Sequence, residues 1–305
     1  MDGTCGLCEN DRTLKQSHLL PSFIFKWKKK HNTGFFRTSE NPNIRAQDGL
    51  KPSMLCGNCE QLFSPWEKQF AEKVFKPFHD KSIIALNYSE WLLQLAVSVS
   101  WRNLYYHKLM GGLTGLSEAQ IKIVYDVLEA SQSYLLDSQS NIDSFEQHIF
   151  PVGTISGGHG NADVSPFLNR YLATAVDFDL LRTDDSCLVY SKLNRLVIIG
   201  VVQHPDSRQF EGTKITHPTG KLSAHNIFLP APLLKYFNIR ADKMANQLSK
   251  MSENQWSIIE KAYEREIDKF NNCEMMKATD KDYSNSGQEA FEVMKSKENT
   301  PDGMK

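Results

Sequence analysis

The sequence predicts an α+β protein, with a zinc-binding module at the N-terminus, an α-helical section, a small antiparallel sheet and C-terminal helices. Three observations support this fold class. Four cysteines occur as two Cys-x-x-Cys pairs near the N-terminus. Apolar residues recur at helical spacing between residues 82 and 137. Between residues 172 and 222, short apolar runs alternate with polar turns, which is typical of antiparallel strands.

The two cysteine pairs are predicted to bind one zinc ion. Cys5 and Cys8 form the first pair, and Cys56 and Cys59 form the second. Two such pairs can place four thiolates tetrahedrally around zinc, at Zn–S distances of about 2.3 Å. The loop between the pairs is long, but the entropy cost of closing it grows only with the logarithm of its length. We therefore expect a closed, structural zinc site. The alternative is four independent reduced thiols.

Two motifs inside and at the end of this loop resemble a known family. They are Ser17-His18-Leu19-Leu20-Pro21 and Leu55-Cys56-Gly57-Asn58-Cys59-Glu60. Together with the first cysteine pair, they make residues 1–80 similar to the zinc-containing HNH (ββα-metal) nucleases. The same order of motifs resembles a set of bacterial proteins of unassigned function. The resemblance implies a ββα-type module over these residues.

The resemblance also implies a nuclease site. In that family the histidine of the His-x-x-Pro step is the general base that activates water, and His18 stands at this position. Other polar residues of the family hold a divalent cation against the scissile phosphate. Glu60, where a typical member has histidine, would be such a ligand for Mg²⁺ or Mn²⁺. The alternative for His18 is a buried histidine that braces the turn before Pro21.

The segment between the cysteine pairs is strongly basic. Residues 12–51 contain nine Lys or Arg against two acidic residues, a net charge of +7, whereas the whole chain carries −1. A local positive patch of this kind is the electrostatic footprint of a phosphate-backbone partner. Residues 21–30 are predicted to be helical, with Pro21 at the first position and aromatic residues between the lysines. The candidate phosphate contacts are Lys26, Lys28, Lys29, Lys30 and Arg37. The alternative is a solvated basic helix end.

The chain is expected to have three parts: a zinc module over residues 1–80, an α+β body over 81–273, and a disordered polar tail over 274–305. Inside the module, Ser64 and Pro65 are predicted to open a helix, with Glu67 as its capping carboxylate. In the body, two helices are expected within 82–137, the second opened by a capping box at Ser117. Strands are expected at about 172–222, and helices within 238–271.

Composition limits the partners. The chain has 305 residues, 40% of them hydrophobic and 23% charged, as expected of a soluble globular protein. No apolar run approaches the ~20 residues needed to span a bilayer, so we expect no membrane partner and a cytoplasmic location. Cys187 and Cys273 are expected to be free thiols, which suits a reducing compartment.

Two functions fit these patterns. The first is a zinc-stabilised HNH-like endonuclease that hydrolyses nucleic-acid phosphodiesters, with structural Zn²⁺ and catalytic Mg²⁺ or Mn²⁺. The second is a non-catalytic zinc-ribbon module that binds nucleic acid or a protein. Both account for the cysteine pairs and the basic loop, but only the first gives His18 and Glu60 a joint role. The sequence identifies no protein partner.

Overall fold

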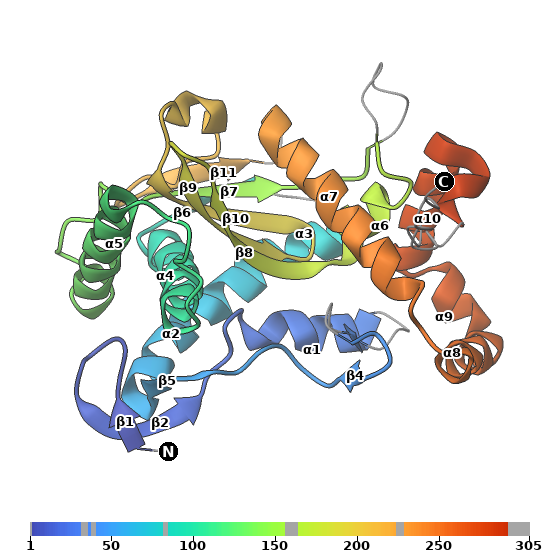
Figure 1. The fold of residues 1–305 in the computed structure, drawn as a ribbon, viewed down its shortest axis with the longest axis horizontal. Helices are drawn as coiled ribbons and strands as arrows, with labels where there is room; N and C mark the ends of the chain where they lie inside the picture. The colour runs from blue at the N-terminus through green and yellow to red at the C-terminus, as the bar shows by residue number, and fades with distance from the viewer. Residues whose placement is uncertain are drawn as a thin grey trace, which may run out of the picture. The chain divides into compact units, whose positions relative to one another are not determined.

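The computed structural model describes residues 2–31, 36–37, 41–81, 85–155, 164–223 and 229–291 (Figure 1). The chain forms two compact units, each assembled from three separate segments. The first unit contains residues 1–28, 48–152 and 175–230, and the second contains residues 29–47, 153–174 and 231–305. This division does not follow the boundaries at residues 80 and 273 that the sequence predicts. The two units are described separately below.

The first unit begins with a three-stranded antiparallel sheet in the order β1-β2-β5. Its strands are β1 (Asp2–Thr4), β2 (Asp11–Gln16) and β5 (Ser53–Cys56). Leu14 of β2 lies opposite Cys56, the last residue of β5. The chain then enters α2 (Gly57–Phe70), which continues through the π-helical turn η1 (Ala71–Phe75) into α3 (Lys76–Lys81). Two paired strands followed by a helix therefore hold the cysteines.

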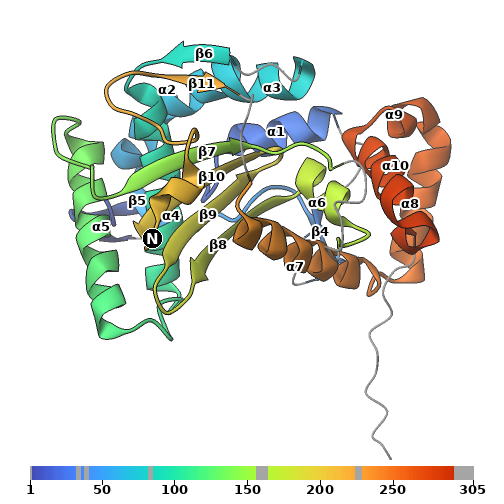
Figure 2. The ribbon, with the colours of Figure 1, turned by 90° about the horizontal axis from the view of Figure 1, so that it is seen from above.

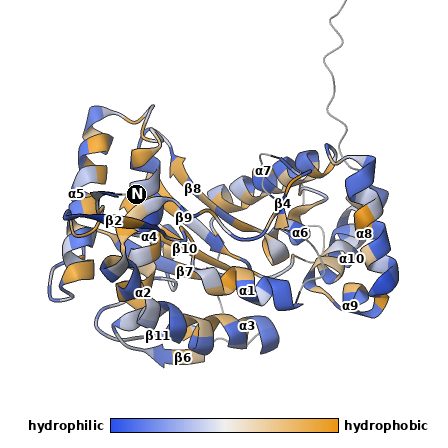
Figure 3. Ribbon diagram, turned by 90° about the horizontal axis from the view of Figure 1, so that it is seen from below, coloured by the Kyte–Doolittle hydropathy of each residue, from blue (hydrophilic) through white to orange (hydrophobic). Residues whose placement is uncertain are grey.

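A four-stranded antiparallel sheet in the order β7-β10-β9-β8 forms the core of the first unit (Figure 2). Its strands are β7 (Glu146–Pro151), β8 (Val176–Arg182), β9 (Cys187–Leu193) and β10 (Leu196–Gln203). Every residue of β9 is buried, and so is every residue of β10 except its last. Helix α4 (Trp91–Leu109) packs against all four strands, and α5 (Glu118–Leu136) packs against α4. Figure 3 shows the hydrophobic residues that line α4 and these strands.

Smaller elements complete the first unit. They are β6 (Ala85–Tyr88), which pairs with β11 (Gly220–Ser223), and the 3₁₀ turn η2 (Ser207–Phe210). Helix α1 (Ser22–His31) starts in the first unit, and its last three residues belong to the second.

The second unit is mainly helical. Its elements are the hairpin β3 (Phe36–Arg37) and β4 (Arg45–Ala46), followed by α6 (Leu168–Thr174), α7 (Ala231–Leu248), α8 (Glu253–Arg265), α9 (Ile267–Asn271), α10 (Glu274–Ser286) and η3 (Gly287–Ala290). Helix α6 packs against both α7 and α10. A buried carboxylate, Asp282 of α10, accepts hydrogen bonds from the backbone N–H groups of Asn169 and Arg170 in the first turn of α6.

The predicted fold class is confirmed, because the protein combines helices with small antiparallel sheets, C-terminal helices and an N-terminal cysteine cluster. The capping box at Ser117 is also confirmed: its hydroxyl accepts from the backbone N–H of Gln120, whose side chain accepts from the backbone N–H of Ser117. Within the described residues, every helix is too short or too polar to cross a lipid bilayer.

Three expectations about local structure differ from the structure. Helix α2 starts at Gly57 rather than at Ser64, so Pro65 lies inside the helix and Glu67 is no capping residue. The strand expected from residue 172 starts at Val176, because residues 168–174 form α6. The tail expected to be disordered from residue 274 contains α10, which Asp282 anchors to α6. Residues 292–305 of that tail lie outside the described residues.

Candidate zinc centre and the His18 turn

The four cysteines of the two pairs form one cluster. The Sγ atoms of Cys5, Cys8, Cys56 and Cys59 all lie within 4.8 Å of one another. Cys5, Cys56 and Cys59 are buried and Cys8 is half-buried. None of the six cysteines of the chain forms a disulfide. Four sulfurs at this spacing, from two Cys-x-x-Cys pairs, are the donor set that zinc prefers in a closed structural site.

Local backbone structure brings each cysteine into the cluster. Between β1 and β2 the chain turns tightly: the N–H of Cys5 donates to the carbonyl of Asn10 over 3.0 Å, and the N–H of Glu9 donates to the carbonyl of Cys5 over 2.9 Å. Glu9 takes the left-handed conformation, with φ of 57°, to close this turn. Cys56 precedes α2 and Cys59 lies in its first turn, where the helix dipole favours thiolates.

The first cysteine turn also packs on the helices of the first unit. A Cβ atom on Gly6 would lie 2.4 Å from the ring of Tyr105 on α4, so only glycine allows this close approach. The carbonyl of Leu7, which is fully buried, accepts from Nε2 of Gln132 on α5 over 2.6 Å. The N–H of Gly6 donates to the carbonyl of Met54 in β5 over 2.9 Å. The turn that carries the first cysteine pair therefore packs directly against helices α4 and α5 of the first unit.

The thiols of the cluster differ in their ionisation. Burial opposes ionisation of Cys8, but hydrogen bonds from the backbone and side chain of Asn10 and from two neighbouring cysteines outweigh it and lower its pKa to about 6. Burial and the neighbouring cysteines raise the pKa of the Cys59 thiol. Hydrogen bonding also ties the cluster together, since the N–H of Cys56 donates to Sγ of Cys5 over 3.3 Å. Zinc requires all four thiolates, so binding of the ion releases protons from the cluster.

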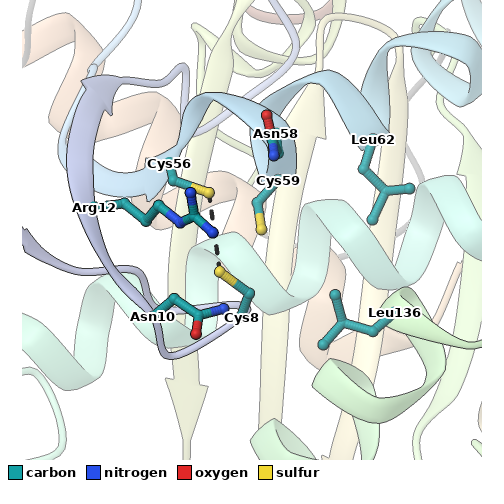
Figure 4. A pocket seen from close by; sticks show the side chains of 8 residues that line it. All are labelled: Cys8, Asn10, Arg12, Cys56, Asn58, Cys59, Leu62 and Leu136. Carbon is teal, nitrogen blue, oxygen red and sulfur yellow. Dashed lines mark hydrogen bonds between the residues drawn. The ribbon is translucent and has the colours of Figure 1, made fainter.

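A pocket of about 270 Å³ opens beside the cluster (Figure 4). Its lining combines three of the cysteines with polar and apolar side chains: Cys8, Asn10, Arg12, Cys56, Asn58, Cys59, Leu62 and Leu136. Figure 4 shows Arg12 among the side chains that line this pocket, with the sulfurs of Cys8 and Cys56 3.9 Å apart. A guanidinium at this position complements the negative charge that four thiolates carry around a zinc ion.

His18 lies two residues after the end of β2, next to a carboxylate. Its Nε2 lies 2.9 Å from Oδ2 of Asp48, and the two side chains are 20% and 28% exposed. Nζ of Lys51 also lies 2.9 Å from Oδ2 of Asp48. Burial raises the pKa of Asp48, but hydrogen bonds from Lys51, His18 and the N–H of Gly49 outweigh it and lower the pKa to about 2. Asp48 is therefore an anion at neutral pH.

The backbone of the His18 turn is fixed from both sides. The carbonyl of His18 accepts from Nη1 of Arg102 on α4 over 2.9 Å, and Nη2 of Arg102 donates to Oε1 of Glu67 on α2 over 2.9 Å. The guanidinium of Arg102, whose side chain is only 4% exposed, lies 5.1 Å from the centre of the Phe63 ring. On the other side, the N–H of Leu19 donates to the carbonyl of Leu50 over 3.0 Å. His18 therefore stands on a rigid turn.

Glu60 lies away from these contacts. It is half-buried in the first turn of α2, directly after Cys59. In the described part of the chain, the side chains that contact His18 through an ion pair or a hydrogen bond are Asp48 and Arg102, and no such contact joins His18 to Glu60. Among those same residues, the four cysteines are the one group of three or more His, Cys, Asp or Glu placed to hold a metal. The joint site of His18 and Glu60 stays a prediction.

The candidate phosphate contacts divide by exposure. Lys26, Lys29 and Lys30 are exposed on α1. Lys28 differs from the expectation, because it is only 7% exposed and burial lowers its pKa to about 8. In the second unit, Nη2 of Arg37 donates to Oε1 of Gln255 over 3.0 Å, and Nη1 donates to the carbonyl of Pro42. Burial, and to a smaller extent the charge of Arg45, lowers the pKa of Arg37.

The aromatic residues between the lysines are core residues rather than a nucleic-acid surface. Phe25 and Trp27 are 8% and 7% exposed. The ring of Trp27 meets Phe75 edge-on at 5.5 Å and His79 at 4.8 Å, both in the helix that follows the second cysteine pair. The apolar spacing along α1 thus reflects packing.

Sequence reasoning missed the residues that hold the His18 turn: Asp48, Lys51, Glu67 and Arg102. Asp48 and Arg102 are separated from His18 by 30 and 84 positions, and no motif marks them. One weak signal exists for Asp48, which is one of only two acidic residues in the basic segment 12–51.

Comparison with protein-family models, with curated proteins and with solved structures gives no match for this chain.

Proposed function

We propose that this protein is a zinc-stabilised, HNH-like endonuclease that hydrolyses nucleic-acid phosphodiesters, with His18 as the general base. The observation that carries the proposal is the environment of His18. It follows strand β2, which pairs with the strand that leads into α2, and its Nε2 lies 2.9 Å from a carboxylate oxygen of Asp48 while the side chain is 20% exposed. A fixed, partly exposed histidine paired with a carboxylate is the arrangement that general-base catalysis requires.

In the proposed reaction, His18 removes one proton from the attacking water. The water oxygen forms a bond to phosphorus as the bond from phosphorus to the leaving oxygen breaks. The leaving oxygen takes a proton from solvent, and the imidazolium later returns its proton to solvent. General-base assistance of this kind is worth about 10²–10⁴-fold in rate. The zinc ion has a structural role, since four cysteine ligands leave no open position on the metal.

A catalytic Mg²⁺ or Mn²⁺ is a separate part of the proposal. When bound, such an ion stabilises negative charge on the phosphate and the leaving oxygen. Glu60 is the candidate ligand, but the described residues do not form a cation site around it. Mg²⁺ is commonly held by one or two carboxylates together with substrate phosphates. Glu60 would therefore hold the ion only with nucleic acid bound, and no step above depends on it.

The deciding experiment is cleavage by the purified full-length chain. Supercoiled plasmid, linear duplex DNA and single-stranded RNA are each incubated with Mg²⁺, Mn²⁺ or EDTA, for the wild type, His18→Ala and Glu60→Ala. His31, which is exposed on α1, provides the matched control as His31→Ala. We expect cleavage by the wild type and by His31→Ala, and at least 10²-fold less by His18→Ala at unchanged zinc content. Equal cleavage by wild type and His18→Ala would exclude His18 as the base.

A second candidate is a non-catalytic zinc module that binds nucleic acid. The exposed lysines Lys26, Lys29 and Lys30 on α1, and the lack of a described cation site beside His18, favour it. In that case no protein variant cleaves under any metal condition, while the wild type still binds nucleic acid. The cleavage assay therefore separates the two functions directly.

A further inference from the structure

We propose that Asp48 is the positioning residue for His18: it fixes the imidazole tautomer that carries its proton on Nε2 and so makes Nδ1 the atom that accepts a proton. The catalytic consequence rests on the proposed function, whereas the tautomer is a property of the protein without substrate. The structure supports this role through the donors around Asp48, the packing of the imidazole and the fixed backbone beneath it.

The hydrogen-bonding capacity of the groups fixes the tautomer. An ionised carboxylate can only accept hydrogen bonds. Oδ2 of Asp48 lies 2.9 Å from Nε2 of His18, an ion-pair distance at which a carboxylate oxygen favours the imidazole form with its hydrogen on Nε2. A neutral imidazole has one N–H, so its other nitrogen, Nδ1, keeps a lone pair.

Asp48 is itself held as an anion by geometry. Its Oδ2 accepts from Nζ of Lys51 over 2.9 Å, and its Oδ1 accepts from the N–H of Gly49 over 3.0 Å. These two donors and His18 account for both carboxylate oxygens. The ammonium of Lys51 also repels a divalent cation from this carboxylate, so the pair of His18 and Asp48 is not a metal site. Its chemistry is that of a carboxylate-oriented base.

Packing limits the rotation of the imidazole. The ring of Phe25 stacks on the His18 ring, with 6.2 Å between ring centres and an angle of 25° between planes. Behind Phe25 lies Gly49, where a Cβ atom would come within 2.3 Å of the Phe25 ring. The turn that carries Asp48 thus packs against Phe25, whose ring is stacked with that of His18. With the His18 carbonyl held by Arg102, ring and backbone are both fixed.

The pair contributes too little stability to explain its presence by folding alone. Ion pairs between partly exposed groups stabilise proteins by about 0–1 kcal/mol. In enzymes with a carboxylate–histidine pair, the carboxylate instead selects the tautomer and orients the ring, and its loss costs about 10⁴-fold in rate where the wrong tautomer results. Asp48 of this chain has the geometry for that second role.

The substitution that tests the role is Asp48→Asn. An amide of the same size can turn its NH₂ group toward Nε2, which then accepts, and the imidazole proton moves to Nδ1. Asp48→Glu restores a carboxylate. Lys51→Met keeps the carboxylate and removes the neighbouring donor, so it is the matched control.

The experiment is ¹⁵N NMR of the histidine side chains in the full-length zinc-loaded chain, at a pH of about 8.5 where imidazoles are neutral. His18→Gln assigns the signals. We expect the Nε2–H tautomer in the wild type and in Lys51→Met, a shift of population to Nδ1–H in Asp48→Asn, and a return toward Nε2–H in Asp48→Glu. Zinc content confirms that each variant folds. A wild type in the Nδ1–H form, or a tautomer that Asp48→Asn leaves unchanged, would overturn the inference.

Cleavage rates then separate this inference from the proposed function. If the wild type cleaves, we expect kcat of Asp48→Asn to fall by about 10²–10⁴-fold with little change in KM. Wild-type cleavage that Asp48→Asn leaves intact would refute the positioning role but not the nuclease. If no protein cleaves while the tautomers behave as expected, the nuclease proposal fails and the assignment of Asp48 stands.

Discussion

Nη1 of Arg102 donates a hydrogen bond to the carbonyl oxygen of His18 over 2.9 Å. Arg102 lies on α4, the helix that covers the four-stranded sheet, and its second nitrogen reaches Glu67 on α2. One buried guanidinium therefore joins three segments that the sequence assigns to two different domains. The backbone position of the candidate base therefore depends on a residue of α4.

The first prediction follows from the packing of the cysteine turn on α4 and α5. Cys56→Ser should lower the zinc content from about one ion per chain to well below one. It should also destabilise the whole first unit, because Gly6 and Leu7 lose the turn that holds them against Tyr105 and Gln132. Structural zinc contributes about 10–16 kcal/mol in small zinc-dependent domains, so partial unfolding is expected. Elemental analysis and near-ultraviolet circular dichroism measure the two effects.

The matched control is Cys273→Ala, which removes a buried thiol in the second unit and should keep the zinc. A zinc-free wild type with an intact near-ultraviolet spectrum would contradict the metal assignment.

The second prediction concerns the exposed lysines of α1. If Lys26, Lys29 and Lys30 contact phosphates, replacing all three by glutamine should weaken binding to every nucleic-acid sequence alike. The dependence of log K on log salt should also become shallower by about 2–3, because each phosphate contact releases about one counterion. Fluorescence anisotropy between 50 and 200 mM salt measures both quantities.

Lys28→Gln serves as the control for this series, since Lys28 is buried and should not change the salt dependence. If the triple variant and the wild type bind with the same salt dependence, these lysines form only a solvated helix surface.

The cysteine cluster could be predicted from the sequence, but the surroundings of His18 could not. Two pairs with identical spacing constrain four side chains locally, and the start of α2 directly after Cys56 completes the cluster. The sequence places the start of α2 too late, because Ser64 and Pro65 match the pattern of a helix N-terminus. Residues 57–63 are already helical. The contact between Asp48 and His18 joins residues 30 positions apart in the sequence, and no local pattern around either residue marks it.

Burial of charged residues was equally hard to predict. The run Lys28-Lys29-Lys30 reads as one solvated surface, yet successive residues of a helix point in directions about 100° apart. Lys28 therefore turns inward on the face that buries Ile24 and Trp27.

In the second unit, the polar sequence of α10 predicts disorder. Its fully buried Asp282 gives this helix a fixed place on α6 through hydrogen bonds rather than through a large apolar face.

The third prediction concerns acid stability. His79 of α3 bonds through Nδ1 to the carbonyl of Phe75 over 2.7 Å, and its Nε2 accepts from the N–H of Arg195 over 3.2 Å. The bond from Arg195 needs a lone pair on Nε2 and therefore the neutral ring. Burial, together with nearby positive charges including Arg195, lowers the pKa of His79 to about 3. The unfolded chain binds this proton near pH 6.5, so the free energy of unfolding falls as the pH drops from about 6.5 toward 3.

Between pH 6.5 and 5, His79 should contribute about 2 kcal/mol to this loss, and His79→Gln should remove that contribution. Urea unfolding followed by tryptophan fluorescence reports mainly on the first unit, which contains four of the five tryptophans: Trp27, Trp66, Trp91 and Trp101. His31→Gln, a change at an exposed histidine, should keep the wild-type slope. An unchanged slope in His79→Gln would show that His79 does not cause the acid sensitivity.

The last prediction tests the buried ion pair of the second unit. Asp282 is 1% exposed, and its Oδ2 lies 2.8 Å from Nε of Arg170 while Oδ1 accepts from the N–H of Asn169 over 2.8 Å. Asp282→Ala leaves the guanidinium of Arg170 buried without its carboxylate and uncaps the first turn of α6. The loss of one partner of a buried pair costs about 3–5 kcal/mol.

Asp280→Ala, at an exposed position one half-turn earlier on α10, is the matched control. Hydrogen exchange should show faster exchange of the amides of Asn169 and Arg170 in Asp282→Ala and unchanged exchange in the control. Equal protection in both variants would mean that α10 is held to α6 by its other contacts.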